Sequence, residues 1–137
     1  MKFHYGRLID HVHLRVADVA ASQRFYRAVV ASLGRPESLV EGAGYFHLDE
    51  LFVDKADGPA SHVHLAFQAR DPAMVAAFHR AALAAGGRDN GAPGERAYHP
   101  GYYAAFALDP DGNNIEAVFH GPASRSAESV VVTPADE

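Results

Sequence analysis

The sequence predicts an α+β fold in which two βαβββ modules form a cupped mixed sheet with helices on its convex face. The first observation is an internal repeat, because Asp-His-Val-His-Leu at 10–14 returns as Ser-His-Val-His-Leu at 61–65. The second is that each copy precedes an amphipathic stretch that ends at a glycine. The third is that short alternating segments follow each of these stretches. A strand, a helix and three strands therefore occur twice.

The first module is expected to begin with a strand over residues 9–16, in which apolar and polar side chains alternate. Asp18 is a suitable N-cap for the following helix, and Gly34 lies where the helix should end. Two further strands are expected around residues 45–54, meeting near residues 48–49. These signals give the first half its strand and helix boundaries.

The second module repeats the plan with a strand around residues 62–67. Asp71 followed by Pro72 predicts a helix start, because proline suits the first turn of a helix. Two later strands are expected on either side of a hairpin turn at 109–113, which reads Asp-Pro-Asp-Gly-Asn. Residues 87–101 are polar, rich in Gly and Pro and without a period, so a loop is predicted there.

The chain of 137 residues has the length of one domain. We expect this domain to span 1–122, with halves at about 8–57 and 59–121. Residues 123–137 are polar and are expected to form a loose tail, although the three valines at 130–132 offer an additional edge strand.

Composition excludes several classes of function. The chain has no Cys, which excludes disulfides, thiolate metal sites and a cysteine nucleophile. A formal charge of −5 without a basic run argues against binding nucleic acid. No apolar stretch approaches the ~20 residues needed to span a bilayer. We therefore expect a cytoplasmic protein that does not interact with membranes.

Histidines and glutamates on the polar faces of the strands indicate a metal site. His11 and His62 occupy equivalent positions in the two copies of the motif, and Glu116 lies on the last strand. Aligning the ends of the two halves makes Glu50 the partner of Glu116. Imidazole and carboxylate groups suit Zn²⁺, Mn²⁺, Fe²⁺, Co²⁺ or Ni²⁺. A divalent cation would also offset the cost of burying two carboxylates.

The motifs also indicate a family. The opening His-Val-His-Leu-Arg-Val-Ala-Asp and the ending Asp-Pro-Asp-Gly-Asn-Asn-Ile-Glu resemble those of the vicinal oxygen chelate superfamily. This superfamily includes glyoxalase I, extradiol dioxygenases, fosfomycin-resistance transferases and bleomycin-binding proteins. The resemblance covers about residues 8–121, and residues 84–120 are similar to a glyoxalase-like subgroup. It implies a cupped sheet with a metal at its centre and pairing into a homodimer.

The resemblance also implies a ligand set. Its two histidines map to His11 and His62, its last-strand glutamate to Glu116 and its fourth ligand to Glu50. A slip of one residue in the first half would offer Asp49 instead of Glu50. Four ligands favour isomerase or lyase chemistry, whereas three ligands form a facial triad suited to Fe²⁺ and oxygen.

Other side chains are expected near the reacting atoms. Candidates for the catalytic base are a displaced Glu50, His99 and Tyr102. The substrate pocket is expected to include His13, His64, Phe52 and Tyr103.

We therefore expect a metal-dependent enzyme that acts on a small oxygenated metabolite or xenobiotic. The alternative is a non-catalytic protein that sequesters a drug-like ligand in the cup, as bleomycin-resistance proteins do. A third interpretation is a homologue without activity.

Overall fold

The structure is a computed structural model that describes residues 1–135. It contains two α-helices, a short 3₁₀ helix and eight strands. In chain order these are β1 (Val12–Val16), α1 (Val19–Ser32), η1 (Pro36–Ser38), β2 (Leu39–Gly42), β3 (Tyr45–Leu48), β4 (Leu51–Lys55), β5 (His64–Gln68), α2 (Pro72–Ala84), β6 (Arg88–Glu95), β7 (Tyr103–Leu108) and β8 (Asn114–Phe119).

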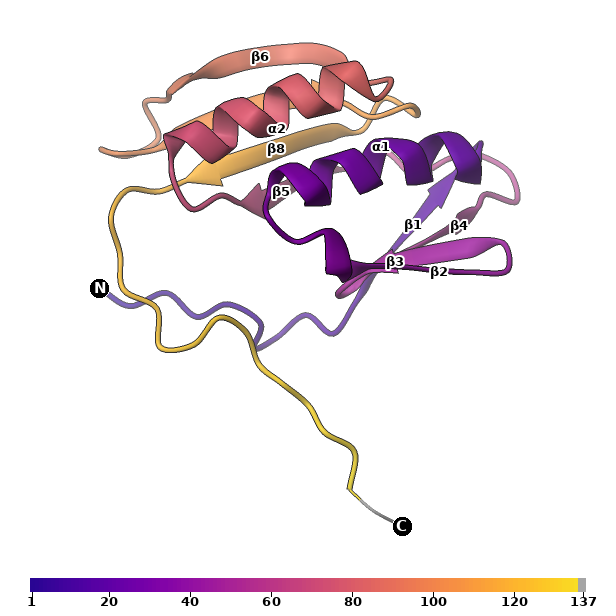
Figure 1. Cartoon of the computed structure of the whole chain (residues 1–137), viewed down its shortest axis with the longest axis horizontal. Coiled ribbons are helices and arrows are strands. Elements are labelled where there is room, and N and C mark those ends of the chain that lie inside the picture. The colour runs from indigo at the N-terminus through magenta and orange to yellow at the C-terminus, as the bar shows by residue number, and fades with distance from the viewer. Residues whose placement is uncertain (136–137) are drawn as a thin grey trace.

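The two halves share one topology. Their four-stranded sheets have the orders β1-β4-β3-β2 and β5-β8-β7-β6. The first strand of each half pairs in parallel with the last, and the remaining pairs are antiparallel. Helices α1 and α2 lie side by side over the same side of both sheets (Figure 1). The predicted α+β fold of two βαβββ modules is confirmed, as two sheets that form an open cup.

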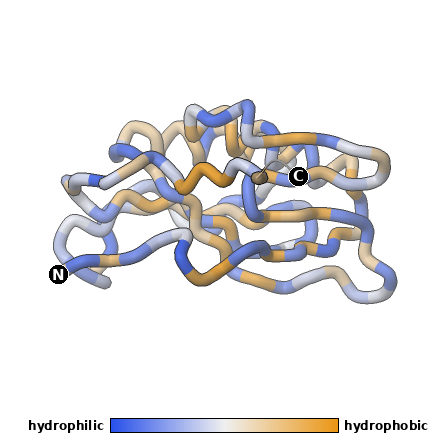
Figure 2. Tube along the Cα trace, turned by 90° about the horizontal axis from the view of Figure 1, so that it is seen from below, coloured by the Kyte–Doolittle hydropathy of each residue, from blue (hydrophilic) through white to orange (hydrophobic). Residues whose placement is uncertain are grey.

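Alternation along the strands separates the two faces of each sheet. Leu14 and Val16 on β1 are fully buried towards the helices, whereas His13 and Arg15 between them are exposed. Figure 2 shows the same change between apolar and polar residues along much of the chain. The core therefore lies between the helices and the sheets, and the polar side chains lie on the concave faces.

The helix starts follow the sequence signals. Asp18 Oδ1 accepts a hydrogen bond from the backbone N–H of Ala21 at 3.1 Å. Asp71 Oδ1 accepts a hydrogen bond from the backbone N–H of Met74 at 2.8 Å. Gly34, directly after the C-cap of α1, has a φ of 73°, which favours glycine. The predicted caps are confirmed at these positions.

The predicted loop at 87–101 is wrong over most of its length, because Arg88–Glu95 forms β6. This edge strand pairs with β7 and shifts register on both sides of Gly91. Gly91 has a φ of 153°, and Pro93 lies in the same strand. Bulges and edge strands of a sheet tolerate Gly and Pro. The Gly and Pro residues that interrupt the alternating pattern in the sequence therefore do not prevent this segment from pairing with β7.

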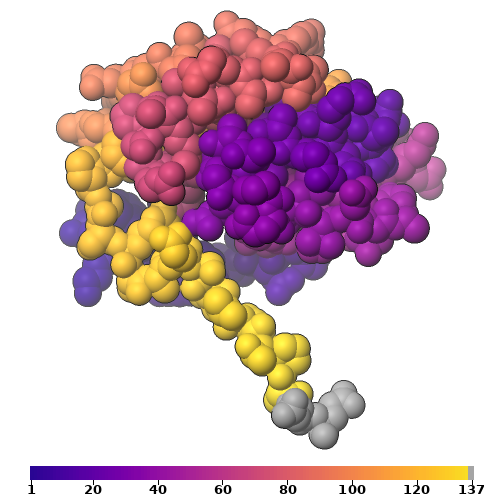
Figure 3. Space-filling model, in the orientation of Figure 1, coloured from indigo at the N-terminus to yellow at the C-terminus, as the bar shows by residue number. Residues whose placement is uncertain are grey.

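The chain after β8 runs down the edge of the molecule, passes the N-terminal segment and then projects away (Figure 3). Residues 120–135 form no helix or strand, so the valines at 130–132 add no edge strand in this described part of the chain. Arg35 donates to Glu128 at 2.6 Å and holds the segment against the first half.

The turn at 109–113 joins the two halves. Asp109 is 1% exposed, and its Oδ2 accepts a 2.6 Å hydrogen bond from the Tyr26 hydroxyl on α1. Asp111 Oδ1 accepts a hydrogen bond from the backbone N–H of Ala17 at 3.0 Å. Burial, with Asp109 beside it, raises the pKa of Tyr26 well above its usual value. A turn in the second half therefore holds the start of α1 in the first.

We predict that Tyr26→Phe lowers the free energy of unfolding by about 1–3 kcal/mol at neutral pH, because buried Asp109 loses a partner. The pKa of Tyr26 is raised on folding, so its contribution is complete below about pH 10 and is lost as the pH rises through the folded-state value. Urea unfolding from pH 8 to 11 should therefore show a smaller alkaline loss in Tyr26→Phe than in the wild type. Equal stabilities at every pH would contradict the role of this hydrogen bond, and Tyr103→Phe is the matched control.

Candidate functional site

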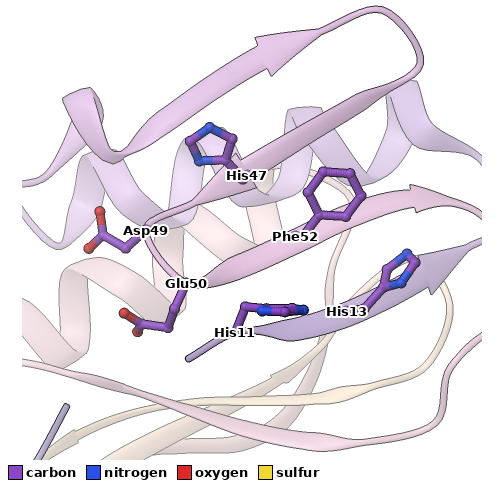
Figure 4. Close-up of a pocket in the computed structure, with 6 residues that line it drawn as sticks. All are labelled: His11, His13, His47, Asp49, Glu50 and Phe52. Atoms are coloured by element: carbon purple, nitrogen blue, oxygen red, sulfur yellow. The ribbon is translucent and has the colours of Figure 1, made fainter. Parts of the chain in front are cut away.

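The concave face of the first half carries a cavity of about 540 Å³. Its lining combines three imidazoles, two carboxylates and one aromatic ring, from His11, His13, His47, Asp49, Glu50 and Phe52. Figure 4 shows the histidines and Phe52 on neighbouring strands, with the two carboxylates at the β3–β4 turn. Phe52 also stacks on Tyr45 with ring centroids 5.2 Å apart. The cavity therefore has an aromatic wall and several groups that can bind or transfer protons.

His11 and Glu50 lie next to each other at one end of this cavity. Val12 pairs with Leu51 in the β1–β4 ladder, which places the two preceding residues side by side. Strand alternation puts Glu50 on the face of Phe52, and Asp49 occupies the turn with a φ of 46°. Both carboxylates line the cavity.

A His–carboxylate pair lies further along the same face. His13 Nε2 is 2.7 Å from Asp54 Oδ1, and these side chains are 36% and 35% exposed. His13 was expected in the substrate pocket, whereas Asp54 was not predicted as a site residue. Asp54 follows Phe52 by one alternation on β4, so continuing the pattern to the strand end would have found it.

The second half carries a similar pair, in which the carboxylate is buried and the histidine is exposed. His64 Nε2 lies 2.8 Å from Glu116 Oε1, and the Glu116 side chain is only 2% exposed. The Tyr102 hydroxyl donates a hydrogen bond to the other oxygen, Glu116 Oε2. Burial, followed by the hydrogen bond to Glu116, raises the pKa of Tyr102. Tyr102 therefore remains a proton donor to Glu116 at neutral pH.

The predicted histidine pair is not assembled as the motif alignment implied. His62 lies before β5 and is exposed, whereas His64 is the residue that contacts Glu116. No three His, Cys, Asp or Glu side chains within residues 1–135 lie close enough together to hold a metal ion. The lining of the cavity beside His11 includes no residue of the second half.

The alignment of Glu50 with Glu116 is wrong in its register. Glu116 pairs with Ala66 in the β5–β8 ladder, and the repeated motif equates Ala66 with Arg15. Arg15 pairs with Asp54. Equating the N-caps Asp18 and Asp71 instead equates Ala66 with His13, which pairs with Phe52. Neither alignment makes Glu50 the counterpart of Glu116. Glu50 as a metal ligand stays a prediction that rests on its place beside His11.

The remaining predicted residues divide between the two faces. His99 lies near the concave side, where its Nε2 is 2.8 Å from His120 Nδ1 and its ring packs on Tyr102. Tyr103, which was expected in the substrate pocket, packs against the helix-side core. His120 lies four residues after Glu116, on the same face by strand alternation, and was not among the predicted site residues.

One pair of donor groups has the spacing of two ligands of a divalent cation. Two ligands at right angles around an ion, each ~2.1 Å away, lie about 3 Å apart. His64 Nε2 and Glu116 Oε1 are 2.8 Å apart, which matches that spacing. His11 Nδ1 lies 2.7 Å from Asp10 Oδ1, which leaves the Nε2 atom of His11 available to a metal. Many histidine ligands have this arrangement, in which a carboxylate binds the ring nitrogen that does not contact the metal.

The fold and these polar concave faces define the architecture of glyoxalase-like proteins. The family model for the glyoxalase/bleomycin resistance protein/dioxygenase superfamily matches residues 8–117. The chain belongs to this superfamily, as its motifs indicated.

Solved structures agree with this assignment. A glyoxalase/bleomycin resistance protein from Albidiferax ferrireducens T118 is 32% identical, with a TM-score of 0.66 and coverage of 80% of this chain and 95% of that protein. A glyoxalase-related enzyme from Fulvimarina pelagi is 20% identical, with a TM-score of 0.69 and coverage of 94% and 99%. Lactoylglutathione lyase from Agrobacterium tumefaciens is 22% identical, with a TM-score of 0.58 and coverage of 82% and 92%. The last two likenesses show the fold alone.

A comparison with curated proteins gave no match. Neither α-helix within residues 1–135 has the length and apolar character needed to cross a bilayer.

We predict that in metal-free protein the Nε2 atom of His64 carries a proton, because it faces a carboxylate oxygen that can only accept. Long-range ¹H–¹⁵N spectra of labelled protein measure this directly. Glu116→Ala should remove the preference for a proton on Nε2. An unprotonated Nε2 in the wild type would show that the His64–Glu116 hydrogen bond is not formed.

Proposed function

We propose that this chain is a metal-dependent enzyme of the superfamily that acts on a small oxygenated metabolite or xenobiotic. The observation that carries the proposal is the buried Glu116 carboxylate, which lies 2.8 Å from a ring nitrogen of His64. A buried carboxylate beside an imidazole is a favourable pair of ligands for a first-row divalent ion. Fe²⁺, Mn²⁺, Zn²⁺, Ni²⁺ and Co²⁺ all suit this chemistry.

The proposed ligands are His11, His64 and Glu116, with Glu50 as a fourth. The geometry favours His64 over His62, which the sequence analysis chose, because only His64 contacts Glu116. Helix positions support the same choice, since equating the two N-caps Asp18 and Asp71 also equates His11 with His64.

We further propose that the protein works as a homodimer. The first half carries His11 and Glu50 at its cavity, and the second half carries the His64–Glu116 pair. If the first half of one chain faces the second half of its partner, the two donor pairs can meet at one ion. The absence of Cys is consistent with the cytoplasmic location that we expect.

The bound metal would act as a Lewis acid on oxygen atoms of the substrate, in isomerase, lyase or dioxygenase-like chemistry. Proton transfer would fall to nearby side chains. Glu50 is exposed at the cavity and can accept a proton, and His99 is a second candidate. Tyr102 is better suited to donating a hydrogen bond than to acting as a base, because its pKa is raised.

A second candidate function is sequestration of a drug-like ligand without catalysis. The observation that favours it is the aromatic wall of the cavity, where Phe52 stacks on Tyr45. A volume of about 540 Å³ lies within the range of small-molecule sites. Such a ligand would bind in the cup without a metal.

Metal analysis separates these functions. We predict that protein purified without chelator contains about one divalent ion per site. His11→Ala, His64→Ala and Glu116→Ala should each lose most of this metal, because each variant lacks a ligand. His79→Ala is the matched control, since His79 pairs with Asp89 near α2.

Equal and negligible metal in the wild type and all variants would contradict the enzymatic proposal. Sequestration would be supported instead if that metal-free protein bound one bleomycin-type ligand per binding site without turnover.

A further inference from the structure

The segment 96–102, between β6 and β7, packs onto the end of β8. The backbone N–H of Arg96 donates to the carbonyl of Tyr102 at 2.9 Å, and the N–H of Tyr102 donates to the carbonyl of His99 at 3.2 Å. Gly101 has a φ of 89°, and a Cβ added there would lie 3.2 Å from the carbonyl oxygen of His120. The segment is therefore a fixed turn seated on the end of β8.

The rings around Tyr102 hold its side chain in place. Tyr102 makes edge contacts with Tyr98, His99 and His120, with centroid distances of 4.9, 5.3 and 5.1 Å. His99 and His120 are in turn joined by a hydrogen bond of 2.8 Å between Nε2 and Nδ1. Aromatic contacts of this kind restrict the ring to one orientation.

The tautomers of this histidine pair follow from their partners. His99 Nδ1 is 2.8 Å from the carbonyl oxygen of Pro100, which only accepts, so this nitrogen carries a hydrogen. In neutral His99 the other nitrogen is an acceptor, and His120 Nδ1–H is the donor to it. The pair thus links the turn to β8 on the side of Tyr102.

Tyr102 in turn controls which oxygen of Glu116 is free. Its hydroxyl donates to Oε2, whereas Oε1 faces His64 Nε2 at 2.8 Å. Because the side chain of Glu116 is 2% exposed, solvent does not compete for either oxygen. With Oε2 engaged, Glu116 can offer one oxygen to an ion beside His64.

We propose that Tyr102 is a positioning residue that fixes Glu116 as a one-oxygen metal ligand, and that the His99–His120 pair holds Tyr102 in place. This inference rests on the proposed metal site and gives the segment 96–102 a role in it. It differs from the sequence-based interpretation of His99 and Tyr102 as catalytic bases, because here neither residue exchanges a proton with the substrate.

The test is Co²⁺ binding by metal-free protein, measured by calorimetry and by visible absorption, without any substrate. Tyr102→Phe should weaken Co²⁺ binding by about 10–100-fold, the usual effect of removing a hydrogen bond to a metal ligand. Its absorption should also change, because Glu116 is then free to bind through both oxygens. Tyr98→Phe is the matched control and should bind like the wild type.

The histidine pair is tested by two variants at one position. His120→Ala should weaken binding and shift the spectrum towards that of Tyr102→Phe. His120→Asn should restore both, because its amide nitrogen can replace the Nδ1 donor. Circular dichroism establishes that each variant is folded.

The outcomes distinguish this inference from the proposed function. If the wild type binds Co²⁺ and Tyr102→Phe binds it within twofold with an unchanged spectrum, the positioning role is wrong and the metal site stands. If Tyr102→Phe is affected but His120→Ala is not, the role assigned to the histidine pair is wrong. If the wild type binds no Co²⁺, the proposed metal site and this inference both fail.

Discussion

The burial of one carboxylate organises the chemistry of this molecule. Removing an ionised carboxylate from water is costly unless other groups replace the lost hydrogen bonds. Glu116 is almost fully buried, and His64 and Tyr102 each satisfy one of its oxygens. The turn before β7 and the end of β8 are arranged around this requirement, and the proposed function depends on it.

The two halves share a scaffold and differ in their concave faces. The first half presents an open cavity with exposed groups, including the half-exposed His13–Asp54 pair. The second half presents the buried carboxylate of Glu116 beside the exposed ring of His64. Duplication thus supplies two similar sheets, one with an open cavity and the other with a buried carboxylate beside an exposed histidine.

Much of the fold was predictable because its signals are local. The N-caps Asp18 and Asp71 and the turn at 109–113 depend on side chains that bond to nearby backbone, so sequence alone identifies them. Strand β6 was not predicted because its Gly and Pro residues indicate a loop, whereas pairing with β7 holds the segment in an extended conformation. The contact of His64, rather than His62, with Glu116 was not predicted, because strand register is set by tertiary contacts rather than by the repeated motif.

The most direct test of the account is the position of a bound metal. A crystal structure of metal-loaded protein, with data collected at the absorption edge of that metal, locates the ion by anomalous scattering. The account predicts a peak ~2.1 Å from His64 Nε2 and Glu116 Oε1, with Tyr102 still bonded to Oε2. A peak elsewhere, or no peak while His64 and Glu116 remain hydrogen-bonded to each other, would contradict it.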